Sequence, residues 1–154
     1  MIWLLLGLVA LVVLGTGAAR ASGLDLTSGG GGYTPQTVLF AQAIARAEGT
    51  VDANGMLTNS VGAAQNNPGD LEDANGNLRT YATPEDGWNA LYNQASVMLY
   101  GPSRIYNPNM TLASAAYLYT GADNQSSWAR TVAGVLGVSI TTTLEQIGGM
   151  ALVS

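Results

Sequence analysis

The pattern of apolar and polar positions divides the chain into three parts. Residues 2–19 are uncharged and mostly aliphatic, residues 21–33 are rich in Gly and Ser, and the rest alternates apolar with polar positions. A helix over the first stretch would be about 27 Å long, close to the roughly 30 Å hydrocarbon core of a bilayer. The pattern predicts a transmembrane anchor over 1–20, a flexible tether over 21–33 and a folded domain over 34–154.

The apolar amino-terminal segment has a second interpretation, a secretory signal, because Ala19-Arg20-Ala21 resembles a cleavage site. The segment lacks the positive residues that begin such signals, and its apolar stretch exceeds the usual length. We therefore favour the anchor. Arg20 is the only nearby cation, so the orientation in a membrane stays open.

Capping residues mark the helices of the domain. Thr34 as N-cap and Pro35 at the first helical position predict a helix over 35–48, with Gly49 as its C-terminal stop.

The same cap returns at Thr83-Pro84, followed by apolar residues every three to four positions up to Gly101. Further helices are expected to begin after Thr111, near Ser126 and near Thr143.

Two copies of Asp-Ala-Asn-Gly, at 52–55 and 73–76, separate the first two long helices. Asn-Gly flanked by β-prone residues is a strong hairpin signal, so a small irregular β region is expected there. The fold class is then α+β and mainly α-helical. The second copy also resembles part of a calcium loop, but its glycine is misplaced and the bidentate glutamate is missing. No metal or other cofactor is expected.

The composition narrows the possible chemistry. The chain has a net charge of −5 and no cluster of basic residues, which excludes nucleic acid as a partner. It contains no Cys, His or Lys, which excludes thiolate chemistry, the usual histidine base and lysine nucleophiles. Acid–base catalysis would have to use carboxylates or tyrosines, and carboxylate chemistry points first to glycoside cleavage.

Glu48 is the carboxylate with the most unusual setting. It shares a helix face with Ala41 and Ile44, which is the apolar face. Partial desolvation and the helix C-terminus both disfavour its charged form, so its pKa should be raised, as a general acid requires. The alternative is a surface glutamate paired with Arg46.

Several motifs together resemble a lysozyme-like, lytic transglycosylase-type family common in phages. The resemblance covers residues 35–147 and rests on AIARAEG at 43–49, NNPGDL at 66–71, YATPEDGWNAL at 81–91, and then Thr111-Leu112, Tyr119, Asp123-Asn124, Trp128, Val132 and Leu136-Gly137-Val138.

This resemblance implies a cleft between a helical lobe and a small β region, with Glu48 as the single catalytic glutamate. Glu48 would protonate the glycosidic oxygen between N-acetylmuramic acid and N-acetylglucosamine, then accept the muramoyl 6-hydroxyl proton as an anhydro product forms. Tyr106, in a loop, is the candidate for stacking on a sugar, whereas Trp88 follows the apolar spacing of its helix and is expected in the core. The residues expected to bind substrate are Asn67, Pro68, Gly69, Asp70, Tyr81, Tyr106, Tyr117, Tyr119 and Trp128.

The sequence departs from the family pattern at two positions. Asp70 replaces the final asparagine of Asn-Asn-Pro-Gly-Asn, and it could serve as the second carboxylate of a hydrolysing muramidase. Trp128 stands where a tyrosine is usual, which leaves Tyr117 and Tyr119 as alternative hydroxyl donors to Glu48. The competing interpretation for the two tyrosines is core packing, and for residues 67–69 it is an ordinary turn.

The expected partners are peptidoglycan, a membrane through residues 2–19 and, in a virion, other membrane or capsid proteins. The favoured setting is the internal membrane of a membrane-containing phage, where the enzyme would open the cell wall locally at entry. A bacterial inner-membrane enzyme facing the periplasm is the second setting. A non-catalytic glycan-binding module and a purely structural virion membrane protein are the alternatives to an enzyme.

Overall fold

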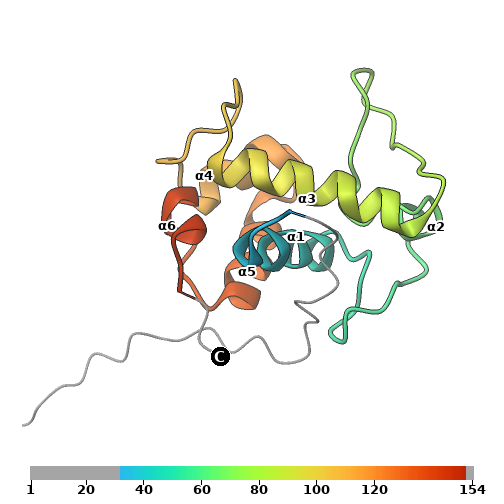
Figure 1. The fold of residues 1–154 in the computed structure, drawn as a ribbon, viewed down its shortest axis with the longest axis horizontal. Coiled ribbons are helices and arrows are strands. Elements are labelled where there is room, and N and C mark those ends of the chain that lie inside the picture. Colours follow the sequence, from blue (N-terminus) through green and yellow to red (C-terminus); the bar gives the residue numbers. More distant parts are fainter. Residues whose placement is uncertain (1–31, 152–154) are drawn as a thin grey trace, which may run out of the picture.

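The computed structural model describes residues 32–151. The anchor predicted over 1–20, most of the tether predicted over 21–33 and residues 152–154 lie outside the described residues. In the described range no helix combines the length and apolarity needed to cross a membrane. Residues 32–151 form six helices joined by turns and loops (Figure 1).

The helix boundaries follow the capping residues. The helices are α1 Pro35–Ala47, α2 Val61–Ala64, α3 Pro84–Tyr100, α4 Leu112–Thr120, α5 Gln125–Leu136 and α6 Leu144–Gly148. All five helices expected from the sequence are confirmed. The short α2 was not expected, because four residues are too few to show a helical period.

Local hydrogen bonds explain why these boundaries could be predicted. The Thr34 hydroxyl accepts from the Thr37 backbone N–H at 3.1 Å, and Thr83 forms a reciprocal capping box with Asp86. At the other end of α1, Gly49 has φ +73°, a left-handed conformation that glycine adopts without strain.

The core is built around α1. This helix packs against α3, α5 and α6, and Figure 1 shows α3 running along one side of it. Ala41 and Ile44 are completely buried, which confirms that the face they share with Glu48 is the apolar one. Trp88 packs on the core and stacks on Tyr92 with ring centroids 5.7 Å apart, as expected. Because α1 is central, the residue after its last turn lies inside the domain.

The expected β region is reduced to two turn segments, 50–58 and 71–79, each closed by one antiparallel bridge. Val51 pairs with Leu57 in the first turn segment, and Glu72 pairs with Leu78 in the second. Among the described residues the β structure consists of isolated bridges, so the mainly α-helical class is confirmed and no extended hairpin forms. Both segments project from the end of the helical body that carries α2 (Figure 1).

Asn67 fastens the base of the second turn segment. Its side chain is completely buried, with Nδ2 donating to the carbonyls of Leu71 at 2.8 Å and Arg79 at 3.0 Å. Its Oδ1 accepts from the Leu71 N–H at 2.9 Å. One amide thus replaces the strand pairing that this segment lacks, and it sets where the neighbouring Asp70 lies.

Candidate active site

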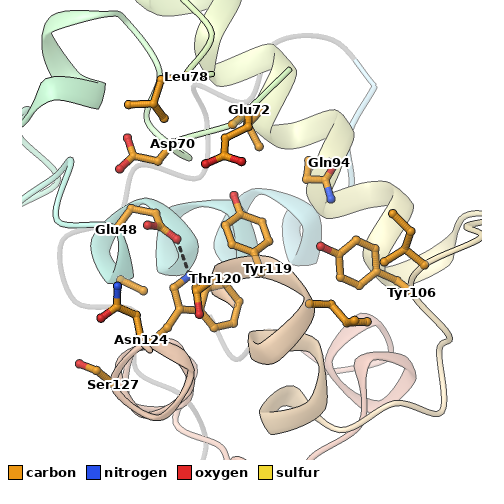
Figure 2. A pocket seen from close by; sticks show the side chains of 15 residues that line it. Glu48, Asp70, Glu72, Leu78, Gln94, Tyr106, Tyr119, Thr120, Asn124 and Ser127 are labelled. Carbon is orange, nitrogen blue, oxygen red and sulfur yellow. Dashed lines mark hydrogen bonds between the residues drawn. The ribbon is translucent and has the colours of Figure 1, made fainter. Parts of the chain in front are cut away.

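Glu48 is the C-cap of α1, and its position follows from the packing of that helix. Its backbone N–H donates to the Ile44 carbonyl at 2.9 Å. The side chain is therefore directed from a buried helix into a cleft of about 840 Å³. Figure 2 shows Glu48 entering this cleft together with Asp70, which comes from a different segment of the chain.

The environment of Glu48 favours its neutral form. Burial raises the pKa of the carboxyl from 4.5 to about 7, the hydrogen bond from Trp128 opposes this, and the charge of Asp70 adds to it. The raised pKa predicted from the helix face is confirmed. The pairing with Arg46 does not occur, since that guanidinium donates to the Ala53 carbonyl at 2.6 Å. A carboxyl with a pKa near neutrality can both release and accept a proton.

Trp128 holds the Glu48 carboxylate in place. Its indole Nε1–H donates to Glu48 Oε1 at 2.7 Å, the bond drawn as a dashed line in Figure 2. The indole is itself buried and stacks on Tyr119, with ring centroids 5.1 Å apart. Tryptophan therefore provides a donor to Glu48 at a position where the family pattern that the sequence resembles has a tyrosine.

We expect Trp128→Phe to raise the pKa of Glu48 further. The indole hydrogen bond stabilises the ionised carboxylate, so removing it favours the protonated form. A hydrogen bond to a charged group is worth about 1.5–3 kcal/mol, which corresponds to a shift of about one pH unit or more. The measurement is the titration of the Glu48 carboxyl by NMR, whose midpoint should move upward. A midpoint that stays in place or moves downward would contradict the role assigned to the indole.

Tyr119 does not donate to Glu48. Its hydroxyl donates to the Gly69 carbonyl at 2.7 Å, and burial, then the charge of Glu48, raises its pKa well above the ordinary value. A tyrosine that stays neutral keeps this bond at any pH of interest. Its role in the site is to join α4 to the turn that precedes Asp70.

Asp70 is the second carboxyl in the cleft. Its backbone has φ +46°, and a Cβ at Gly62 would overlap its Oδ1. This oxygen is buried and has no hydrogen-bond partner among the described residues. Burial, followed by the charge of Glu72, raises the pKa of Asp70. Glu48, Asp70 and Glu72 together make the cleft acidic, which suits an uncharged ligand better than an anion.

The remaining walls come from α3, α4, α5 and the loop between α3 and α4. The cleft is lined by Ala47, Glu48, Asp70, Leu71, Glu72, Leu78, Gln94, Ile105, Tyr106, Leu118, Tyr119, Thr120, Asn124, Ser127 and Trp128. Most of these were not singled out from the sequence. Exposed apolar side chains are one signal for a binding surface, and Ile105 is 62% exposed while Leu118 is 42% exposed, but exposure is known only once the chain is folded.

Several residues expected to bind substrate do not line the cleft. Asn67, Pro68 and Gly69 are buried, and their polar groups are used internally: the Pro68 carbonyl accepts from Thr50, and the Gly69 carbonyl from Tyr119. The competing interpretation of 67–69 as a structural turn is the one that the contacts support.

Two of the expected tyrosines also lie outside the cleft. Tyr117 is 53% exposed and borders a separate hollow with Met110 and Gln125, so it is not a donor to Glu48. The side chains at positions 117 and 119 point to different sides of α4. Each residue of an α-helix turns by about 100°, so residues two positions apart differ in direction by about 200°. Tyr81 is tied by its backbone to Gln65, and its hydroxyl is buried outside the cleft lining.

Tyr106 does line the cleft, but most of its ring is inaccessible. It is 8% exposed, and burial raises its pKa while contact with Gln94 lowers it. So little of the ring is exposed that it offers no broad surface on which a sugar could stack. The exposed Ile105 beside it offers more apolar surface.

No family model, curated protein or solved structure matches the chain. The functional argument therefore rests on the chemistry of the cleft and on the motifs described above.

Proposed function

We propose that this protein is a lytic transglycosylase that cleaves peptidoglycan between N-acetylmuramic acid and N-acetylglucosamine in a lysozyme-like domain. The observation that carries the proposal is the state of Glu48: a carboxyl with a pKa of about 7, held by Trp128 inside a cleft of about 840 Å³. Such a group is available as an acid at neutral pH, and the cleft has the size of a typical ligand site.

One carboxyl can perform both proton transfers of this reaction. Glu48 gives its proton to the glycosidic oxygen as the bond from that oxygen to the muramoyl C1 breaks. The resulting carboxylate takes the proton of the muramoyl 6-hydroxyl while its oxygen bonds to C1, which forms the 1,6-anhydro ring and restores the acid. No water enters the bond-forming step, so a second carboxylate is not required.

The direct test is to digest purified peptidoglycan with the full-length protein in detergent and to identify the released muropeptides by mass. Anhydro-muramyl ends are the expected products. Products with reducing ends, which are heavier by one water than the anhydro products, would show that the protein is a hydrolase and not a lyase. A folded protein that releases nothing would overturn the proposal and favour the glycan-binding or structural alternatives.

Muramidase hydrolysis is the second candidate, because Asp70 shares the cleft with Glu48 and its charge acts on it. Retaining and inverting hydrolases both need a second carboxylate. In this account Asp70 would activate water or stabilise the sugar cation.

Asp70→Asn separates the two mechanisms. For a lyase we expect cleavage to continue within a few-fold, with the alkaline limb of the pH profile moved downward because the charge that raises the pKa of Glu48 is gone. For a muramidase the substitution should lower the rate by about 100-fold or more, as expected for loss of an acid–base group. Initial rates from pH 5 to 9, with the exposed Asp123→Asn as the matched control, distinguish the outcomes.

The cellular setting is proposed from the sequence of the first 31 residues. An anchor over 1–20 would hold the enzyme at the internal membrane of a phage virion, where a cleavage domain on a tether could open the wall at entry. Attachment to a bacterial inner membrane is the alternative. Fractionation of virions and of host membranes with an antibody against the domain tests the two.

A further inference from the structure

A second groove opens from the cleft between the second turn segment and α3. This side groove has a volume of about 450 Å³ and is lined by Leu71, Glu72, Arg79, Ala90, Asn93, Gln94 and Val97. It shares Leu71, Glu72 and Gln94 with the cleft. The two hollows therefore adjoin each other and together form a site with two arms, with Glu72 and Gln94 between them; Figure 2 shows these two side chains from the cleft side.

The two arms of this site differ in charge. The cleft is lined by Glu48, Asp70 and Glu72 and, among the described residues, by no basic one, whereas the side groove is lined by one acid, Glu72, and one base, Arg79. An anionic group is therefore repelled more strongly from the cleft than from the side groove, where Arg79 offers it an opposite charge. The ligand that fits is thus a neutral chain with an acidic branch.

The turn segments supply an internal comparison. Both have the same backbone hydrogen bonds, from Thr58 to Thr50 in the first and from Arg79 to Leu71 in the second, each at 2.9 Å. The bridge positions correspond as well, with Val51 in the first segment where Glu72 stands in the second.

This comparison shows that the charges are not needed for the fold of the turn. Thr58 occupies the position of Arg79, and Val51 that of Glu72, in a segment of the same geometry that lines neither arm of the site. The charged pair occurs only in the copy that borders the site. This distribution is expected if the charges serve a ligand.

We propose that the side groove binds the peptide stem of the peptidoglycan strand, with Arg79 binding a stem carboxylate. This inference rests on the proposed function. The stem leaves the muramoyl ring sideways through its lactyl ether, so a strand lying in the cleft must send its stem into a lateral opening. Stem peptides carry free carboxylates, and the strand itself is uncharged.

The contacts of Arg79 leave its guanidinium able to bind a carboxylate. Its Nε donates to the Glu72 carbonyl at 2.9 Å, which orients the guanidinium and uses one of its five N–H groups. A carboxylate prefers paired N–H donors of this kind.

The test compares two substrates: peptidoglycan strands with stems, and the same strands after an amidase has removed the stems and the freed lactyl carboxylates have been converted to primary amides, so that these stripped strands carry no charge. We expect Arg79→Gln in the full-length protein to lower kcat/KM on stem-bearing strands by about tenfold or more, since hydrogen bonds to charged groups are worth about 1.5–3 kcal/mol. On stripped strands the rate should change by less than about twofold, which is within the spread expected when no partner is lost.

Arg46→Gln is the matched control, because Arg46 also donates to a turn carbonyl, that of Ala53, but lines neither arm. It should show no difference between the substrates. Arg79→Thr places the residue of the first turn segment in the second, so it should fold with a near-native melting temperature and reproduce the effect of Arg79→Gln.

Equal losses on both substrates would mean that Arg79 only supports the turn, and the inference would be overturned. Undiminished cleavage of both substrates by the variants would overturn it as well, while leaving the proposed function intact. Failure of the unmodified protein to cleave either substrate would overturn the proposed function together with this inference. Loss confined to stem-bearing strands supports both.

Discussion

In the proposed function, we expect Glu48→Gln to abolish glycan cleavage, with a fall in kcat of about 1,000-fold or more, because this one carboxyl would both donate and accept a proton. Glutamine has nearly the same shape and can still accept the bond from the Trp128 indole through its amide oxygen. The substitution therefore removes the proton and leaves the cleft in place. The measurement is the rate of muropeptide release at pH 6–7.

Glu145→Gln is the matched control for this result. Glu145 is exposed in the first turn of α6 and does not line the cleft, so the same chemical change there should leave cleavage unaltered. Retention of more than about a tenth of the activity in Glu48→Gln would exclude Glu48 as the general acid, given the size of such contributions.

The raised pKa also determines how this variant responds to pH. A carboxyl whose pKa is raised by folding favours the folded state while protonated, and that advantage is lost as pH rises from 4.5 to about 7. Ionisation of Glu48 above this range destabilises the fold by about 3 kcal/mol. Glu48→Gln should therefore be more stable than the unmodified protein at pH 8 and similar to it at pH 4. Urea unfolding at the two pH values measures the difference.

Asn67→Ala is expected to destabilise the protein by about 3–5 kcal/mol, a large part of the stability of an ordinary domain. The substitution removes three partly buried side-chain hydrogen bonds and leaves the Leu71 N–H and the Arg79 carbonyl without these partners. Urea unfolding at pH 7 measures the loss. Because this amide fixes the base of the second turn segment, cleavage should fall as well, even at temperatures where the variant stays folded.

Asn67→Asp refines this prediction. An ionised aspartate can accept from the Leu71 N–H but cannot donate to the two carbonyls, so the variant should be destabilised at neutral pH. Protonation at low pH restores one donor, and part of the stability should return. Asn109→Ala, at an exposed asparagine, is the control and should change stability by less than about 0.5 kcal/mol. A loss below about 1 kcal/mol in Asn67→Ala would contradict the role given to this amide.

The parts of the structure that could be predicted from the sequence are those decided by local interactions. Thr34 and Thr83 cap their helices through bonds that span three residues, and Gly49 ends α1 because its backbone is left-handed. The apolar face that contains Ala41 and Ile44 is a property of helical periodicity. The raised pKa of Glu48 followed from the same reasoning, since the face places it against the core before any partner is known.

Other features depend on contacts between distant segments. The indole of Trp128 reaches Glu48 across 80 positions of the chain, and the Tyr119 hydroxyl reaches Gly69 across 50. The sequence alone could therefore place the same motif residues in the cleft or in the interior, and only the structure shows that 67–69 and Tyr117 do not line the cleft.

By itself, the sequence of this protein determined the positions of the main helices, the two turns and the carboxyl whose pKa is raised, because each depends on neighbours a few residues away. Only the tertiary structure decided which donor holds Glu48, that Asn67 bonds the base of the second turn segment and that one of two similar turns borders both hollows. Those outcomes depend on burial and on tertiary contacts of α1, α4 and α5 with the segment around Asp70. Such contacts join distant segments, so no local stretch of sequence predicts them.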